Sequence, residues 1–343
     1  MNTIIKIGNK FVGTGHSPFI IAEMACAHDG SFDKAKKIID AAADAQADAI
    51  QLQFFFCDTT VTPHHEVYQV LKRIQFSEQQ WTELFQYARS KNIFVFVCTY
   101  DMPSVKLAMK LKADGIKLNS SDLSNPEIII AVAESGIPFT LGTGAQTMDE
   151  IKNGLEIASK HGAENSVLMY GVQNFPTKIE DLNILKILIL KEKFGIPVGY
   201  QDHTDAEDPF SNMVDLIAVG MGANIIEKHI TLNRAEKGID HQASLNPNEF
   251  KAFVKNIRTA FVALGSKEIK PFSESDLRYR KFQKKSIVAA KNIMKGEKIS
   301  KENVLFIRNV IPGLSPAEFT QVSGKIAVRD ITAYENIIQS DVA

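Results

Sequence analysis

The feature of this sequence that most constrains its fold is a regular alternation of short apolar runs with longer amphipathic segments. The alternation extends from about residue 19 to residue 265 and contains eight pairs. Such a pattern is typical of repeated βα units built on a parallel sheet. The eight expected strands are Phe19–Met24, Ala47–Phe54, Ile93–Cys98, Gly115–Leu118, Pro138–Gly142, Val167–Gly171, Ile196–Tyr200 and Asn224–His229.

The segments between these strands have helical spacing. Within the expected helix Asp33–Ala45, the apolar residues Ala35, Ile38, Ile39 and Ala42 fall on one face. The expected helix Thr147–His161 opens with a Thr and a Glu three residues later, the pattern of a capping box. We therefore predict helices that each bury one face.

Eight βα units in roughly 250 residues match the size of a closed barrel, although a doubly wound sheet gives similar alternation. No glycine-rich G-x-G-x-x-G follows the first strand, which weakens the dinucleotide-binding alternative. We predict an α/β protein with a (β/α)8 TIM barrel. The segment Ile4–Val12 alternates and contains Gly8-Asn9, which predicts a β-hairpin that plugs one end of the barrel.

The chain changes character after the eighth unit. Residues 268–285 contain a proline, several serines and a basic cluster, so we predict a linker, with the barrel over residues 1–267. Residues 286–343 have short β-type runs and turn residues, so we predict a second domain there. Domains of this small size often pack against a partner surface. We interpret the basic cluster as a solvated connection rather than a nucleic-acid patch.

Charge and cysteine content exclude several classes of protein. The chain has 39 basic and 40 acidic side chains, so its net charge of −1 gives no general attraction for nucleic acid or an anionic membrane. The three cysteines lack metal-type spacing and fit reduced thiols. The N-terminal segment lacks signal-peptide features, and no run of about 18 apolar residues occurs. We expect a soluble cytoplasmic enzyme.

Reactive groups of such barrels lie at the C-terminal ends of the strands and in the loops that follow. This rule selects a set of polar side chains from the sequence: Glu23, Gln51, Gln53, Thr99, Lys117, Ser120, Asp122, Thr143, Gln201, Asp202, His203, Glu227 and His229.

Two histidines occur in this set, at the ends of neighbouring strands. His203 and His229 are 229 − 203 = 26 residues apart, which is one βα unit. A lone buried histidine is usually structural, but a pair at this end of a barrel predicts a shared metal ion. Because carboxylates and no cysteine lie nearby, we expect Mn²⁺ or Mg²⁺, with water and substrate oxygens completing the shell.

Two further side chains are hard to assign to structure alone. Lys117 precedes Ser120, Ser121 and Asp122, so a cation and two hydroxyls project where a phosphate or carboxylate would bind, unless the lysine simply reaches solvent. Glu23 lies in an apolar run, where an unpaired carboxylate is costly. We favour a functional role for Glu23 over a buried ion pair.

Several sequence blocks resemble the sialic acid synthases, the family of N-acetylneuraminate, legionaminate and pseudaminate synthases. The similar blocks are Ile20–Glu23 followed by His28–Ser31, Gln201–Thr204, Ile226–His229 and the C-terminal segment. They occur in the family's order and cover nearly the whole chain. The C-terminal segment is similar to the antifreeze-like (SAF) domain of those enzymes.

The resemblance implies a condensation of phosphoenolpyruvate with an N-acylated open-chain hexose, giving a nonulosonic (sialic-type) 2-keto acid and phosphate. It implies that the two histidines hold a metal that polarises the aldehyde, and that the enzyme is a domain-swapped homodimer. The implied roles are catalysis for Glu23, Asp122 and Glu227; phosphoenolpyruvate binding for Gln51, Gln53, Thr99, Lys117, Ser120 and Gln201; and sugar binding for Asp240, Phe175 and, from the partner subunit, Arg308.

The chain departs from the family at the donor side. Gln51 stands where the family has a lysine, Gly142 and Gln201 replace serines, Asp122 replaces a glutamate and Phe175 a tyrosine. Losing a charged contact to a phosphate removes roughly 1.5–3 kcal/mol of binding free energy. Two alternatives therefore stay open: a barrel enzyme that runs an aldol reaction with another donor, and a sugar-binding homologue without turnover.

Overall fold

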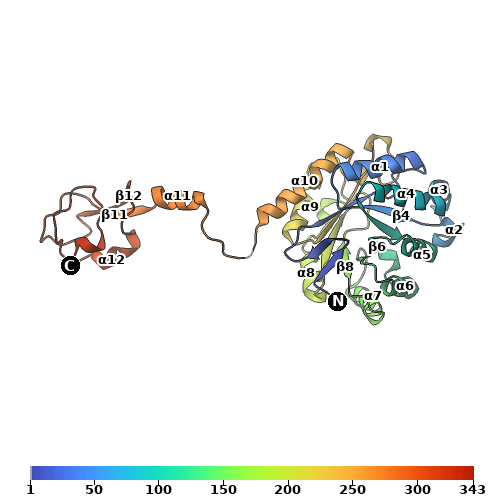
Figure 1. Cartoon of the computed structure of the whole chain (residues 1–343), viewed down its shortest axis with the longest axis horizontal. Helices are drawn as coiled ribbons and strands as arrows, with labels where there is room; N and C mark the ends of the chain where they lie inside the picture. Colours follow the sequence, from blue (N-terminus) through green and yellow to red (C-terminus); the bar gives the residue numbers. More distant parts are fainter. Residues whose placement is uncertain (1, 267) are drawn as a thin grey trace. The chain divides into compact units, whose positions relative to one another are not determined.

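Eight parallel strands close into a barrel, and helices surround it (Figure 1). The TIM-barrel prediction is therefore confirmed, and the doubly wound alternative is excluded. Most barrel strands read as continuous apolar runs because the interior covers one face and helices cover the other. The strands are β3 (Phe19–Glu23), β4 (Ala49–Phe54), β5 (Phe94–Thr99), β6 (Gly115–Leu118), β7 (Phe139–Gly142), β8 (Ser166–Tyr170), β9 (Val198–Asp202) and β10 (Ile225–His229).

Several helices of the barrel begin at capping residues that the sequence makes recognisable. At α7 (Met148–Lys160), Thr147 and Glu150 form the predicted capping box. In α1 (Phe32–Asp44) the four residues expected on one face are all buried. The other helices are α2 (Cys57–Thr60), α3 (Tyr68–Ile74), α4 (Glu78–Ser90), α5 (Met102–Lys110), α6 (Pro126–Glu134), α8 (Lys186–Phe194), α9 (Ser211–Gly220) and α10 (Pro247–Leu264).

An N-terminal hairpin closes the bottom of the barrel, as predicted. Its strands β1 (Ile4–Ile7) and β2 (Lys10–Gly13) pair antiparallel. Ile5, Ile7 and Val12 pack with inward side chains near the strand starts, including Phe19 and Ile225. Because apolar side chains fill this end, the polar inward residues are left to the opposite, C-terminal mouth.

One glycine inside the barrel is required by this packing. A Cβ atom at Gly115 would lie 2.2 Å from the Phe96 ring, which fills the barrel interior beside it. Any larger residue at this position would push that ring out of the core.

The structure is a computed structural model that describes residues 2–266 and 268–343. Two compact units divide at Gly265 and Ser266. The predicted barrel boundary at residue 267 lies outside the described residues. In the second unit, β11 (Lys285–Ala289) and β12 (Val304–Arg308) pair antiparallel, and α12 (Phe319–Val322) packs nearby.

Part of the segment expected to be a linker is helical. Helix α11 (Glu274–Gln283) begins at Ser273, whose hydroxyl and the Asp276 carboxylate form a capping box. All of its side chains are exposed. Two of the expected β-type runs in the second unit contribute only isolated bridges, Ile293 to Ile331 and Lys298 to Ile326, because turns interrupt them.

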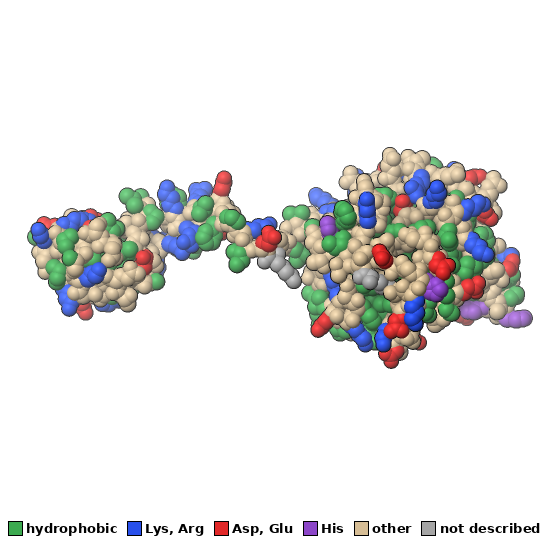
Figure 2. All heavy atoms as spheres, turned by 60° about the horizontal axis from the view of Figure 1, so that its bottom comes forward, with side chains coloured by type: hydrophobic (Ala, Val, Ile, Leu, Met, Phe, Trp, Pro, Cys, Tyr) green, Lys and Arg blue, Asp and Glu red, His purple; other side chains and the backbone are tan. Residues whose placement is uncertain are grey.

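The visible surface carries both signs of charge. Figure 2 shows Lys and Arg side chains interspersed with Asp and Glu over the barrel unit, rather than gathered by sign. This distribution agrees with the net charge of −1. Among the described helices, none combines the length and the apolar character needed to span a membrane.

Candidate active site

A cavity of about 310 Å³ opens at the C-terminal ends of the barrel strands. Its walls come from strand ends and from the loops after them. Of the residues selected from the sequence, eight line it: Glu23, Gln53, Lys117, Phe175, Gln201, His203, His229 and Asp240.

A buried polar network forms beside the cavity, between strands β3, β4, β6 and β10. The Lys117 ammonium forms an ion pair with Glu227. The side-chain amide of Gln51 donates to the carboxylates of both Glu23 and Glu227, the second over 3.2 Å. The Ala25 backbone N–H donates to Glu23 over 2.6 Å. One cation therefore serves two carboxylates, and the neutral amide of Gln51 joins them.

Burial and neighbouring charges raise the pKa of both Glu23 and Lys117, for different reasons. Burial, assisted by the nearby Glu227 carboxylate, raises the pKa of Glu23 well above its ordinary value. Burial opposes the charge on Lys117, but the Glu227 and Glu23 carboxylates outweigh it and raise the lysine pKa to about 12. Lys117 is thus a buried, charged side chain, and the interpretation of a lysine reaching solvent is wrong.

Several buried polar atoms around this network lack a hydrogen-bond partner among the described residues. They are the hydroxyls of Thr99, Ser120 and Thr140 and the side-chain carbonyls of Gln51 and Gln201. Buried polar groups are normally paired, so such a concentration marks a place where a ligand or water completes the bonding. Donors and acceptors are both available next to Lys117.

The glycine at position 142 has a steric reason. A Cβ atom there would lie 2.7 Å from the Ser120 hydroxyl and 2.8 Å from the Ser120 backbone nitrogen. A serine at position 142 would therefore require Ser120 to lie elsewhere.

The two histidines lie next to each other in the cavity lining, with ring centroids 5.3 Å apart. His203 Nδ1 lies 2.6 Å from the Val172 carbonyl, so it carries the proton and leaves Nε2 as a free acceptor. His229 Nδ1 has no partner among the described residues. Burial lowers the pKa of both rings, which are therefore neutral near pH 7.

These features fit a divalent cation. Neutral imidazoles with available nitrogens are metal ligands, and a carbonyl that fixes the tautomer of one ring is the usual outer contact of such a ligand. In the part of the chain that the structure describes, no third His, Cys, Asp or Glu joins this pair closely enough to be a ligand. A bound ion would need water or substrate oxygens for the rest of its shell.

Asp240 enters the cavity from the loop before α10. Its backbone is left-handed, with φ of 62°, and its carboxylate accepts the Cys26 backbone N–H over 3.5 Å. Burial raises its pKa. Phe175 covers the histidines from another loop, with its ring centroid 4.2 Å from that of His203.

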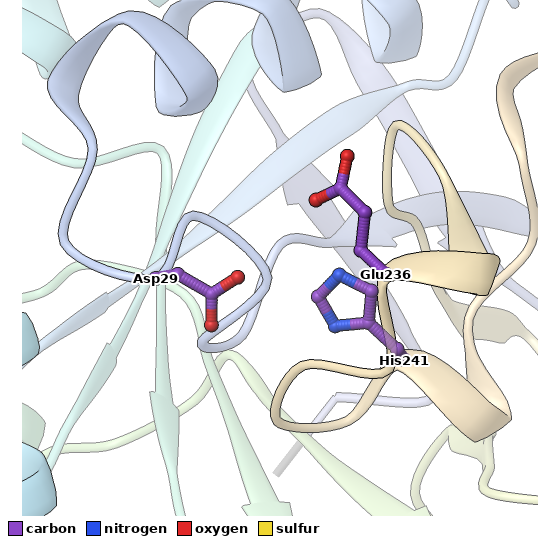
Figure 3. Close-up of side chains that lie close together, drawn as sticks. All are labelled: Asp29, Glu236 and His241. Carbon is purple, nitrogen blue, oxygen red and sulfur yellow. The ribbon is translucent and has the colours of Figure 1, made fainter.

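Next to Asp240, three side chains gather from two loops, Asp29 from the first βα loop and Glu236 and His241 from the last (Figure 3). The Lys34 ammonium lies 3.0 Å from Asp29 and 2.5 Å from Glu236. This ammonium already pairs with both carboxylates, so we interpret the cluster as an ion-pair bridge between the loops.

The remaining predicted site residues lie apart from the cavity lining. Thr99 and Ser120 are buried just behind it. Asp122, in the short 3-10 helix Ser120–Asp122, is a hydrogen-bond acceptor for Ser121 and does not line the cavity. Arg308 ends β12 in the second unit and is exposed there.

One wall of the cavity was missed by the sequence reasoning. Cys26, Phe55, Leu71 and Tyr100 form an apolar surface on the side of the first three βα loops. Phe55 and Tyr100 directly follow strands, so the strand-end rule would have selected them if it had included apolar residues. Leu71 belongs to α3, whose position no strand pattern indicates.

Comparison with protein families gives two matches along the chain. The model of the NeuB family matches residues 38–269, and the model of the SAF domain matches residues 284–343.

Individual relatives match over most of their length. An uncharacterized protein of Methanocaldococcus jannaschii is 36% identical over 89% of this chain and 88% of its own. The N,N'-diacetyllegionaminic acid synthase of Legionella pneumophila is 30% identical over 95% of each chain. The crystal structure of N-acetylneuraminic acid synthetase from Leptospira borgpetersenii has a TM-score of 0.75 and 30% identity, covering 82% of this chain and 97% of that one.

Proposed function

The chain belongs to the NeuB family and ends in a SAF domain, and from this premise we propose that it is a nonulosonic acid synthase. It condenses phosphoenolpyruvate with the aldehyde form of an N-acylated hexose resembling N-acetylmannosamine. The products are a nine-carbon 2-keto acid and inorganic phosphate. One water molecule is consumed, and its oxygen balances the reaction. The observation that carries the proposal is one cavity that joins a neutral histidine pair to a buried lysine, with the hydroxyls of Thr99 and Ser120, which lack a partner among the described residues, buried behind its lining.

The donor binds on the lysine side of the cavity in this proposal. Lys117 meets the phosphate or carboxylate of phosphoenolpyruvate as a charged donor. The Thr99 and Ser120 hydroxyls have bonding capacity to spare. The neutral side chains in this subsite are Gln51, Gln53 and Gln201.

The acceptor aldehyde lies toward His203 and His229. These side chains would hold Mn²⁺ or Mg²⁺, which supplies Lewis-acid polarisation of the aldehyde oxygen. Phe175 shields the pair from water, since its ring lies against His203 and 5.7 Å from His229. Asp240 accepts hydrogen bonds from the sugar hydroxyls.

Three carboxyl groups are candidates for proton transfer. Glu23 lines the cavity and is held by two hydrogen bonds from Gln51 and Ala25. Glu227 contacts Lys117 behind it. Asp122 lies outside the lining, so its part requires a substrate that reaches beyond the cavity. We assign the main acid/base role to Glu23.

Assembly and location belong to the same proposal. We propose a domain-swapped homodimer in which Arg308 contacts the sugar in the partner's barrel. Exposed apolar side chains on two consecutive helices, α8 and α9, support an oligomer, among them Ile189 and Met213 at 48% and 49% exposure. The three free, buried cysteines support a reducing compartment, the cytoplasm.

A second candidate keeps the barrel and the metal but uses a donor with less negative charge. One observation favours it: the donor side has a single lysine against two carboxylates, because Gln51 replaces the family's lysine. Pyruvate, without the phosphate, would place less charge beside Glu23 and Glu227. The reaction would then be a reversible aldol addition.

The two candidates differ in what they release. The protein is incubated with Mn²⁺, a panel of N-acetylated hexoses and either phosphoenolpyruvate or pyruvate, and free phosphate and 2-keto acid are measured. The proposal predicts phosphate and a longer keto acid with phosphoenolpyruvate alone as donor. Product from pyruvate instead supports the second candidate. If neither donor is consumed while a sugar stabilises the fold, the synthase assignment is wrong.

A further inference from the structure

Behind the histidine pair, the barrel carries a second pair of residues at matching positions. Asp202 of β9 and Lys228 of β10 are register partners, each one residue before His203 or His229. Side chains alternate along a strand, so these two point outward to the helices while the histidines point into the barrel. Asp202 is thus the direct chain neighbour of His203, and Lys228 that of His229.

The outer pair is completely buried and bonded. The Lys228 ammonium forms ion pairs with Asp202 and with Asp215 of α9, the latter over 3.0 Å. The side chains of Lys228, Asp202 and Asp215 are each 0% exposed, so none of the three charged groups reaches solvent. The Tyr200 hydroxyl donates to Asp202 over 2.8 Å.

The Asp202 carboxylate also closes a turn around His203. Its Oδ2 accepts the Thr204 backbone N–H over 3.3 Å and the Thr204 hydroxyl over 2.7 Å. An Asp that bonds the backbone two residues on forms an Asx-turn, whose central residue here is His203. The His203 carbonyl in turn accepts the Thr177 N–H over 2.8 Å.

These bonds fix the backbone of His203 on both sides, while Val172 fixes its ring. Charged groups without water are costly, and a well-packed apolar cluster is often as stable as a buried ion pair. A buried cluster of three charged side chains, which costs free energy to form, is expected where it fixes the position of a functional side chain. The geometry determined here is that of the imidazole whose Nε2 is free.

We propose that Asp202, anchored by Lys228, is a positioning residue that presents His203 to a divalent cation. This inference rests on the proposed metal-assisted function. Asp202 does not touch the substrate or the ion; it acts through the turn. Removing its charge is expected to lower the cation affinity by roughly 10- to 100-fold, the usual effect of losing an outer contact of a metal ligand.

The test is Mn²⁺ binding by calorimetry, without substrates, to the full chain and to Asp202→Asn. In this variant an amide replaces either Oδ2, which accepts from Lys228 and Thr204, or Oδ1, which accepts from Tyr200, and in both cases the carboxylate charge that anchors the turn on Lys228 is lost. Asp215→Asn is the matched control, because it changes the same ion cluster but not the turn. We expect at least a tenfold weaker affinity for Asp202→Asn and less than a threefold change for Asp215→Asn.

Equal Mn²⁺ affinities in all three proteins would overturn the inference while leaving the proposed function intact. Equal losses in both variants would also overturn it, because they would indicate general destabilisation. If Asp202→Asn does not fold, Thr204→Val and Thr204→Ser replace it; only the valine variant should lose affinity, and wild-type affinity there rejects the turn. A wild-type chain that binds no Mn²⁺ removes both the inference and the metal half of the function.

Discussion

At the scale of single residues, the most informative position is Gln51. It is fully buried and its amide bridges two carboxylates that would otherwise repel each other. A lysine here would keep these contacts and add a charge. Compared with a lysine, Gln51 therefore lowers the positive charge of the proposed donor subsite without leaving a gap in the network.

Restoring the lysine should strengthen donor binding. For Gln51→Lys we expect roughly tenfold or more tighter binding of phosphoenolpyruvate, since a hydrogen bond to a charged group contributes about 1.5–3 kcal/mol. Calorimetric titration without sugar measures this. Gln79→Lys, on the exposed surface of α4, adds the same charge elsewhere and should change nothing. An unchanged affinity in Gln51→Lys would refute our location of the donor.

A second residue-scale prediction concerns His28, which is 0% exposed and stacks on Phe76 with ring centroids 4.5 Å apart. Burial lowers its pKa from 6.5 to about 4. As the pH falls from about 6.5 to 4, the unfolded chain takes up a proton that the folded chain does not. The free energy of unfolding should fall by about 3 kcal/mol over this range.

Denaturant unfolding of wild type and His28→Gln at several pH values tests this. The glutamine stays neutral and retains an acceptor for the Gly30 N–H. Its unfolding free energy should depend less steeply on pH than that of wild type. Parallel curves for wild type and His28→Gln would show that His28 does not contribute.

Much of the site could be predicted at this scale, because one rule applies to every strand end. Gln201, His229 and Lys117 lie together since parallel strands deliver their last inward residues to the same mouth. Asp215 could not be found this way. It comes from a helix, and nothing in its neighbourhood indicates that Lys228 will reach it.

At the scale of elements, the hairpin β1–β2 fills the end of the barrel where the strands begin, so losing its inward side chains should destabilise the barrel. Ile7 is 0% exposed among the inward apolar side chains. Ile7→Ala should lower the free energy of unfolding of the barrel by about 2–5 kcal/mol, through lost burial and a cavity. Lys6→Ala, on the exposed face of the same strand, is the control. A loss below about 1 kcal/mol in Ile7→Ala would mean that the hairpin does not plug the barrel.

The elements of the barrel were predictable to within two residues at each strand end, because apolar runs and caps are local signals. Thr147 illustrates this, since its capping box predicted where α7 begins. Helix α11 was not predicted. Its capping box at Ser273 lies in a polar segment without an apolar face, which reads as a loop.

At the scale of the whole molecule, the proposal joins two units through a partner. If Arg308 acts in the neighbouring subunit, Arg308→Ala and His203→Ala should complement each other. Each variant alone has a defect in every site. In a mixed dimer, the barrel of the Arg308→Ala chain receives an intact Arg308, so one site in two is complete.

Random mixing of the two variants should therefore recover about a quarter of the wild-type activity, because half of the dimers are mixed. Activity is measured after mixing and exchange of the subunits, with each variant alone as the control. If no activity is recovered although mixed dimers are present, Arg308 does not act across the dimer. The sequence alone did not predict this assembly, since the dimer follows from the family.

The central claim is that one cavity joins the three carbons of phosphoenolpyruvate to a sugar aldehyde, and isotope labelling tests it most directly. Phosphoenolpyruvate with ¹³C at all three carbons is supplied with Mn²⁺ and the preferred N-acetylated hexose, and the products are analysed by mass spectrometry. The proposed function predicts a nine-carbon 2-keto acid that carries all three labels, with one phosphate released per molecule. Phosphate accompanied by labelled pyruvate, with no label in a sugar product, would contradict it.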